Sequence, residues 1–78
     1  SEFNDYMSKL LNLQIVRTAP YIYKVFSDNE DTINCSFLLK NGTGNVFMNG
    51  KMANRKITGQ NFIFWGDIHK GENSIVIS

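Results

Sequence analysis

Hydrophobic and polar residues follow two different periodicities along this chain, and the periodicity changes near residue 13. In the first segment the apolar residues recur at spacings of three and four: Phe3, Tyr6, Met7, Leu10 and Leu11. This spacing predicts a helix of about three turns with one apolar face, capped at its start by Asn4 or Ser1. So short a helix needs a surface to lie on, and we expect it to cover a sheet.

From residue 13 onward, apolar residues alternate with polar ones at a period of two, which predicts β-strands. The segments predicted as strands are residues 13–17, 21–26, 33–40, 45–48, 51–58, 62–65 and 74–77, of which residues 62–65 form the most hydrophobic run and are expected to be a central strand. The strand at 21–26 is apolar on both faces, with Tyr21 and Tyr23 on one and Ile22 and Phe26 on the other. Either it is covered on both sides or one of its aromatic rows is an interface.

Glycine-containing dipeptides separate these strands and predict how they connect. Asn41-Gly42 and Asn49-Gly50 supply the two positive φ angles of a type I′ hairpin turn, and Gly59-Gln60 turns the chain again. Residues 66–73 are predicted to be a loop. The pattern therefore predicts one α+β domain over residues 1–78, an antiparallel six- to seven-stranded meander sheet with one N-terminal helix packed on it.

Composition places the chain among globular proteins. It has 78 residues, 42% of them hydrophobic and 13% aromatic, whereas disordered segments are poor in aromatics. A net charge of +1 argues against binding to nucleic acid or an anionic membrane. No apolar run reaches the roughly 18 residues of a membrane span, and no signal peptide is visible. The start Ser1-Glu2-Phe3, without methionine, is interpreted as a cloning remnant on a fragment of a larger protein.

The single cysteine, Cys35, has no internal disulfide partner, which favours a reducing, cytoplasmic location. Two glycosylation sequons, Asn34-Cys35-Ser36 and Asn41-Gly42-Thr43, point the other way. We interpret them as accidental in a chain rich in asparagine.

Few residues here are suited to catalysis. A Cys35–His69 dyad would need the fold to bring together a predicted core cysteine and a histidine in a predicted loop. Asp67 with His69, or the acidic turn at residues 28–31, supplies too few ligands for zinc and the wrong spacing for calcium. No glycine pattern matches a phosphate-binding loop. We therefore expect no enzyme activity, no metal and no cofactor.

Basic residues concentrate at Lys51, Arg55 and Lys56, near Phe47 and Phe62. Such a mixture on a sheet suits single-stranded nucleic acid, which we keep as the alternative function. The same lysines would also protect an edge strand from unwanted pairing, or meet an acidic peptide.

Three segments, residues 36–42, 45–51 and 61–65, together resemble the strand core of a polo box, with its short turns and late aromatic strand. The resemblance covers about residues 24–65 and is nearest to the last polo box of the centriole-duplication polo-like kinases. It implies a non-catalytic part of a Ser/Thr kinase that dimerises or docks the kinase onto a centriolar scaffold at the centrosome. The phosphate-binding His-x-Lys pair of the mitotic members is absent, because His69 and Lys70 are adjacent.

An excess of aromatic residues for so small a sheet predicts a protein-interaction module, which binds a peptide or helix or pairs with itself as a homodimer. The residues that we expect to contact the partner are Tyr21, Tyr23, Phe26, Phe47, Arg55 and Lys56. The strand that holds Arg55 is also a candidate edge for strand addition.

Overall fold

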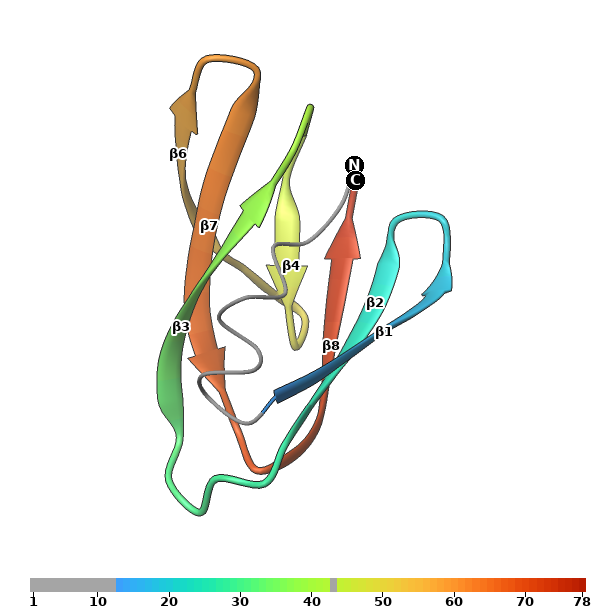
Figure 1. Ribbon diagram of the computed structural model, residues 1–78, viewed down its shortest axis with the longest axis vertical. Coiled ribbons are helices and arrows are strands. Elements are labelled where there is room, and N and C mark those ends of the chain that lie inside the picture. Colours follow the sequence, from blue (N-terminus) through green and yellow to red (C-terminus); the bar gives the residue numbers. More distant parts are fainter. Residues whose placement is uncertain (1–12, 43) are drawn as a thin grey trace.

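Two antiparallel sheets packed face to face form the part of the chain that the computed structural model describes, residues 13–42 and 44–78 (Figure 1). The eight strands are β1 (Leu13–Ala19), β2 (Ile22–Ser27), β3 (Ile33–Leu39), β4 (Val46–Met48), β5 (Lys51–Met52), β6 (Asn54–Thr58), β7 (Asn61–Ile68) and β8 (Gly71–Ile77). One sheet has the order β1-β2-β8-β4-β5 and the other β3-β7-β6. Every neighbouring pair is antiparallel. The described residues therefore form an all-β sandwich.

The predicted α+β class with a single meander sheet is wrong. The helix expected at the start lies outside the described residues, and those residues contain strands and turns but no helix. Consecutive strands are often not neighbours, because β3 pairs with β7 and β8 lies between β2 and β4. The alternation of residues locates a strand but does not identify its partner, so it could not separate one sheet from two.

The two Asn-Gly dipeptides form different connections in the structure. Asn49 and Gly50 have φ angles of 53° and 78° and connect β4 to β5 as a two-residue hairpin, as predicted. Asn41 also has a positive φ of 53°, but Gly42 does not, and the chain there leaves one sheet for the other. The predicted hairpin at Asn41-Gly42 is therefore wrong, since β3 and β4 are in different sheets.

Two further turns were expected near the end of the chain. Gly59-Gln60 connects β6 to β7, with Thr58 paired to Asn61 on either side of the turn, as predicted. The loop expected over residues 66–73 is wrong, because β7 continues to Ile68 and β8 already begins at Gly71. Only two residues connect these strands across the sandwich.

The core lies between the sheets and uses the alternate residues that face inward. They are Leu13, Tyr23, Val25, Cys35, Phe37, Leu39, Val46, Met48, Phe62, Phe64, Ile68, Ile75 and Ile77. Phe37 and Phe64 are partners across β3 and β7, and their rings stack with centroids 5.3 Å apart. Burial of this apolar surface is the main stabilising contribution in so small a domain.

Gly66 allows the two sheets to approach each other closely. A Cβ atom at this position would lie 2.7 Å from Sδ of Met48, which enters from the opposite sheet. Any larger residue at position 66 would force the Met48 side chain to move.

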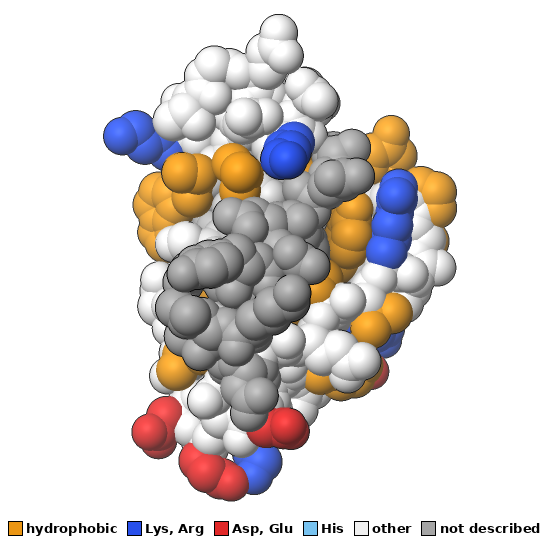
Figure 2. Space-filling view, viewed as in Figure 1, with side chains coloured by type: hydrophobic (Ala, Val, Ile, Leu, Met, Phe, Trp, Pro, Cys, Tyr) orange, Lys and Arg blue, Asp and Glu red, His pale blue; other side chains and the backbone are white. Residues whose placement is uncertain are grey.

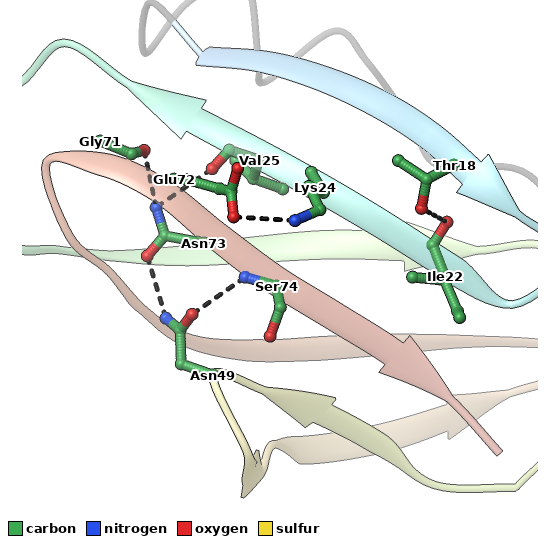
Figure 3. A network of polar contacts seen from close by, with 9 residues as sticks. All are labelled: Thr18, Ile22, Lys24, Val25, Asn49, Gly71, Glu72, Asn73 and Ser74. Atoms are coloured by element: carbon green, nitrogen blue, oxygen red, sulfur yellow. Dashed lines mark hydrogen bonds and ion pairs between the residues drawn. The ribbon is translucent and has the colours of Figure 1, made fainter.

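Two polar residues of the described part are buried, Ser27 and Asn73, and Asn73 of β8 is 1% exposed. Its Nδ2 lies within hydrogen-bonding distance of the carbonyl oxygens of Val25, His69 and Gly71, at 3.1, 2.8 and 3.2 Å. Its Oδ1 accepts from the backbone N–H of His69 and from Nδ2 of Asn49, both at 2.9 Å. Figure 3 shows the contacts of Asn73 with Val25, Gly71 and Asn49. Asn73 thus fixes the β7–β8 connection to β2 and to the β4–β5 turn.

Candidate functional site

The outer face of the five-stranded sheet carries a row of apolar side chains that crosses four strands. Ile22 of β2 pairs with Val76 of β8, Val76 with Phe47 of β4, and Phe47 with Met52 of β5. We call these four residues the apolar stripe. With neighbouring strands about 4.8 Å apart, the stripe spans roughly 14 Å.

The apolar stripe is accessible to solvent. Met52 is 58% exposed, Ile22 38% and Val76 37%, and Phe47 is half-buried. An antiparallel sheet with one face on the core normally presents polar residues on the other face. A continuous apolar row there contributes nothing to the core, so we interpret it as a contact surface.

Polar and charged groups border the apolar stripe along the strands. Lys24 of β2 and Glu72 of β8 form an ion pair of 2.8 Å, and Ser74 lies opposite Lys24. Val16 of β1, 38% exposed, is the cross-strand partner of Lys24 and adds a further apolar side chain. Figure 2 shows hydrophobic side chains at the surface over the β1–β2 hairpin. An apolar centre with a polar rim is the usual composition of a protein interface.

The four aromatic residues predicted to contact a partner are divided by the fold. Phe26 and Phe47 are half-buried on strands of the five-stranded sheet, and Phe47 belongs to the apolar stripe. Tyr21 is 60% exposed in the turn that precedes β2. Tyr23 is 5% exposed and belongs to the core, with the Arg17 guanidinium 5.8 Å from its ring centroid. Tyr23 is therefore corrected to a core residue, because β2 places it on the face turned toward the other sheet.

The predicted basic cluster does not form one surface. Arg55 donates from Nη1 to the carbonyl oxygen of Gly44, and its guanidinium lies 5.7 Å from the ring centroid of Phe62. Lys56 follows directly in β6 and so points to the opposite face of that sheet. Lys51 is in β5, in the other sheet. Arg55 and Lys56 thus face opposite sides of one sheet, and Lys51 belongs to the other sheet.

Cys35 and His69 each hydrogen bond to another residue rather than to each other. The Cys35 thiol, 1% exposed, donates to the carbonyl oxygen of Ile33 at 3.8 Å. Burial, and secondarily the Asp67 carboxylate, raises the pKa of this thiol above its ordinary value of 9.0, which opposes formation of the nucleophilic thiolate. Nδ1 of His69 lies 2.9 Å from the Thr32 hydroxyl. No cluster of three or more metal-ligating side chains occurs within residues 13–42 and 44–78.

Sequence reasoning missed Ile22, Val76 and Met52 as surface residues. Their exposure depends on which strands lie side by side, and the sequence does not state that. Asn73 was also missed, although it stands two and four residues before Ile75 and Ile77 and so shares their inward face once this segment is a strand.

Searches of family models, curated proteins and solved structures found no match to this chain. In the described part of the chain no helix has the length and apolarity that crossing a membrane requires.

Proposed function

We propose that this domain is a non-catalytic protein-interaction module that self-associates through the apolar stripe. The observation that carries the proposal is the cross-strand row Ile22–Val76–Phe47–Met52 on the outer face of the five-stranded sheet. In a dimer with two-fold symmetry, the apolar stripe of one copy packs against the apolar stripe of the other. Both copies then contribute the same residues to the interface.

The stripe supports weak association. Its four side chains cover less area than the roughly 800 Å² per partner of a standard stable interface. We therefore expect a dissociation constant on the order of micromolar to millimolar rather than an obligate dimer.

Two other interpretations have less support. The alternative of single-stranded nucleic acid binding needs Lys51, Arg55 and Lys56 on one surface, whereas Arg55 and Lys56 are on opposite faces of β6 and Lys51 is in the other sheet. Strand addition at the edge strand β6 is opposed by Arg55 and Lys56, because charged side chains on an edge strand protect it from pairing. The polo-box resemblance and a centriolar role remain predictions, and the proposal does not depend on them.

Sedimentation equilibrium over a concentration series tests the proposal. The wild-type mass should rise from one chain toward two, and Val76→Lys should remain a monomer because the dimer would bury an unpaired charge. Ser36→Lys is the matched control, since it places the same charge at an exposed position of β3 in the other sheet. A wild-type chain that stays monomeric at millimolar concentration, or equal dimerisation by all three proteins, would refute the proposal.

A further inference from the structure

A hollow beside β7 is lined by the chain's single tryptophan, Trp65, and by a set of polar side chains. It forms where the chain changes sheets at Ala53. Pairing between β6 and β7 ends at Asn54 and Trp65, so that Gly66–Ile68 has β3 on one side and no partner strand on the other. The volume of the hollow is about 380 Å³, within the range of small-ligand sites.

Trp65 is available as a stacking surface. Its cross-strand neighbours are Ser36 of β3 and Asn54 of β6, both exposed and both too small to cover an indole ring. Trp65 itself is half-buried, so part of the residue stays accessible, and it lines the hollow. A partly exposed indole is suited to contact with a flat apolar face of a ligand.

Hydrogen-bonding groups of both kinds surround the indole. Asp67 lies two residues beyond Trp65 on the same face of β7, and its Oδ1 accepts from Nδ2 of Asn34 at 3.3 Å. The His69 ring contacts the Thr32 hydroxyl through Nδ1. No residue in the described part of the chain engages Oδ2 of Asp67 or Nε2 of His69. Among the described residues, no hydrogen bond or ion pair engages the side chains of Asn54 and Lys51.

This composition excludes several ligand classes. The described residues offer no group of three metal-ligating side chains. A phosphate or other anion would meet the Asp67 carboxylate, with Lys51 as the only lysine or arginine of the lining. A purely apolar ligand would remove the remaining hydrogen-bonding positions of the amides, the carboxylate and the imidazole from water without offering them a hydrogen bond.

We propose that the hollow beside β7 binds a neutral sugar. A pyranose ring presents a flat face of C–H groups to the Trp65 indole, while its hydroxyls both donate and accept. Asp67 accepts from those hydroxyls, Lys51 donates to them, and the amides of Asn34 and Asn54 do both. The hollow shares one residue, Met52, with the apolar stripe, whereas Trp65, Asp67 and Asn54 lie outside the stripe and Ile22, Val76 and Phe47 lie outside the hollow.

Because Trp65 is the only tryptophan, its indole signals report on this site alone. Glucose, galactose and N-acetylglucosamine should each be titrated into the full chain, with tryptophan fluorescence and the indole Nε1–H resonance as readouts and ethylene glycol as the solvent control. We expect at least one sugar to shift both signals with a dissociation constant on the order of 1 mM, as suits a ligand of about a dozen heavy atoms.

Variants show whether the binding uses the hollow. Asn54→Ala and Asp67→Ala should each weaken sugar binding by about tenfold, the loss expected for one hydrogen-bonded group. Gln60→Ala is the matched control, an exposed amide at the far end of the same β6–β7 hairpin, and Val76→Lys tests independence from the apolar stripe; both should bind as the wild type does. The proposal is overturned if no sugar shifts the indole signals, if ethylene glycol shifts them equally, or if the two hollow variants bind with unchanged affinity.

Discussion

The side-chain amides of Asn49 and Asn73 hydrogen bond to each other, with Nδ2 of Asn49 donating to Oδ1 of Asn73 at 2.9 Å. Asn49 is exposed in the β4–β5 turn, and Asn73 is buried in β8. Asn49 also pairs with Ser74, accepting its N–H through Oδ1 and donating its own backbone N–H to the Ser74 carbonyl, both at 2.9 Å. An exposed turn is thus fixed to a buried strand, and with it the start of β5.

Asn73→Ala should lower the free energy of unfolding by about 3 kcal/mol. The substitution leaves the buried carbonyl of Val25 and the part-buried N–H of His69 without their partner, and an unsatisfied buried group costs roughly 1–3 kcal/mol. Urea denaturation measures the change, and Gln14→Ala, at an exposed position of β1, should change stability by less than about 0.5 kcal/mol. Equal stabilities for the two variants would show that the Asn73 network does not stabilise the fold.

Gly66→Ala should destabilise the domain by about 2 kcal/mol, because its Cβ meets the Met48 side chain. In a Met48→Ala background the same substitution should cost much less, since the obstructing sulfur is gone. A double-mutant cycle by chemical denaturation measures this coupling. Additive costs would mean that the two residues do not limit the distance between the sheets.

Tyr23→Ala should lower the free energy of unfolding by about 3 kcal/mol, as expected when a buried aromatic side chain is removed. Tyr21→Ala, only two residues earlier, should cost less than about 1 kcal/mol, because the Tyr21 side chain is largely exposed. Thermal unfolding of both variants makes the comparison. A larger loss of stability in Tyr21→Ala than in Tyr23→Ala would contradict the assignment of Tyr23 to the core and Tyr21 to the surface.

Stability should fall at high pH through Cys35. Burial raises the pKa of the thiol in the folded chain, so above about pH 9 the unfolded chain loses this proton first, and ionisation favours unfolding. Cys35→Ala removes this contribution. The stability difference between wild type and Cys35→Ala should therefore be constant below about pH 8 and shrink as the pH rises further. A difference that stays constant up to pH 10 would contradict a raised thiol pKa.

Val76→Lys should remain folded, with stability within about 1 kcal/mol of the wild type, because a lysine on the outer face keeps its charge in water. Circular dichroism and urea denaturation check this before any binding experiment. If Val76→Lys unfolds, Met52→Lys replaces it in the sedimentation test, since Met52 is the most exposed residue of the stripe.

The sequence predicted strands well and their arrangement poorly, for a physical reason. Alternation at Cys35, Phe37 and Leu39 correctly marks an inward face, since each side chain of a strand has only two directions available. Pairing of β8 with β2 and β4 depends on long-range packing that no local pattern records. Asn41-Gly42 shows the same limit, because an identical dipeptide makes a hairpin at Asn49-Gly50 and a crossing between sheets here.

The candidate surface was predicted in part. Aromatic excess pointed to Phe47 and Tyr21, which are accessible, and equally to Tyr23, which is not. Tyr21 and Tyr23 are two residues apart and would share a face if both lay in a strand, but Tyr21 lies in the turn before β2, with a φ of 70°. The alternating pattern did not show where β2 begins, so sequence alone assigned the two tyrosines to the same face.

The position of β8 determines when the domain can fold during its synthesis. β8 is the last of the eight strands to leave the ribosome, yet it lies between β2 and β4 near the middle of the larger sheet. Until it emerges, β4 and β5 have no connection to β1 and β2 within their sheet, and the Asn73 side chain is not there to join them. The nascent chain must therefore remain incompletely folded, with its apolar strands exposed to chaperones, until nearly all of these residues have been translated.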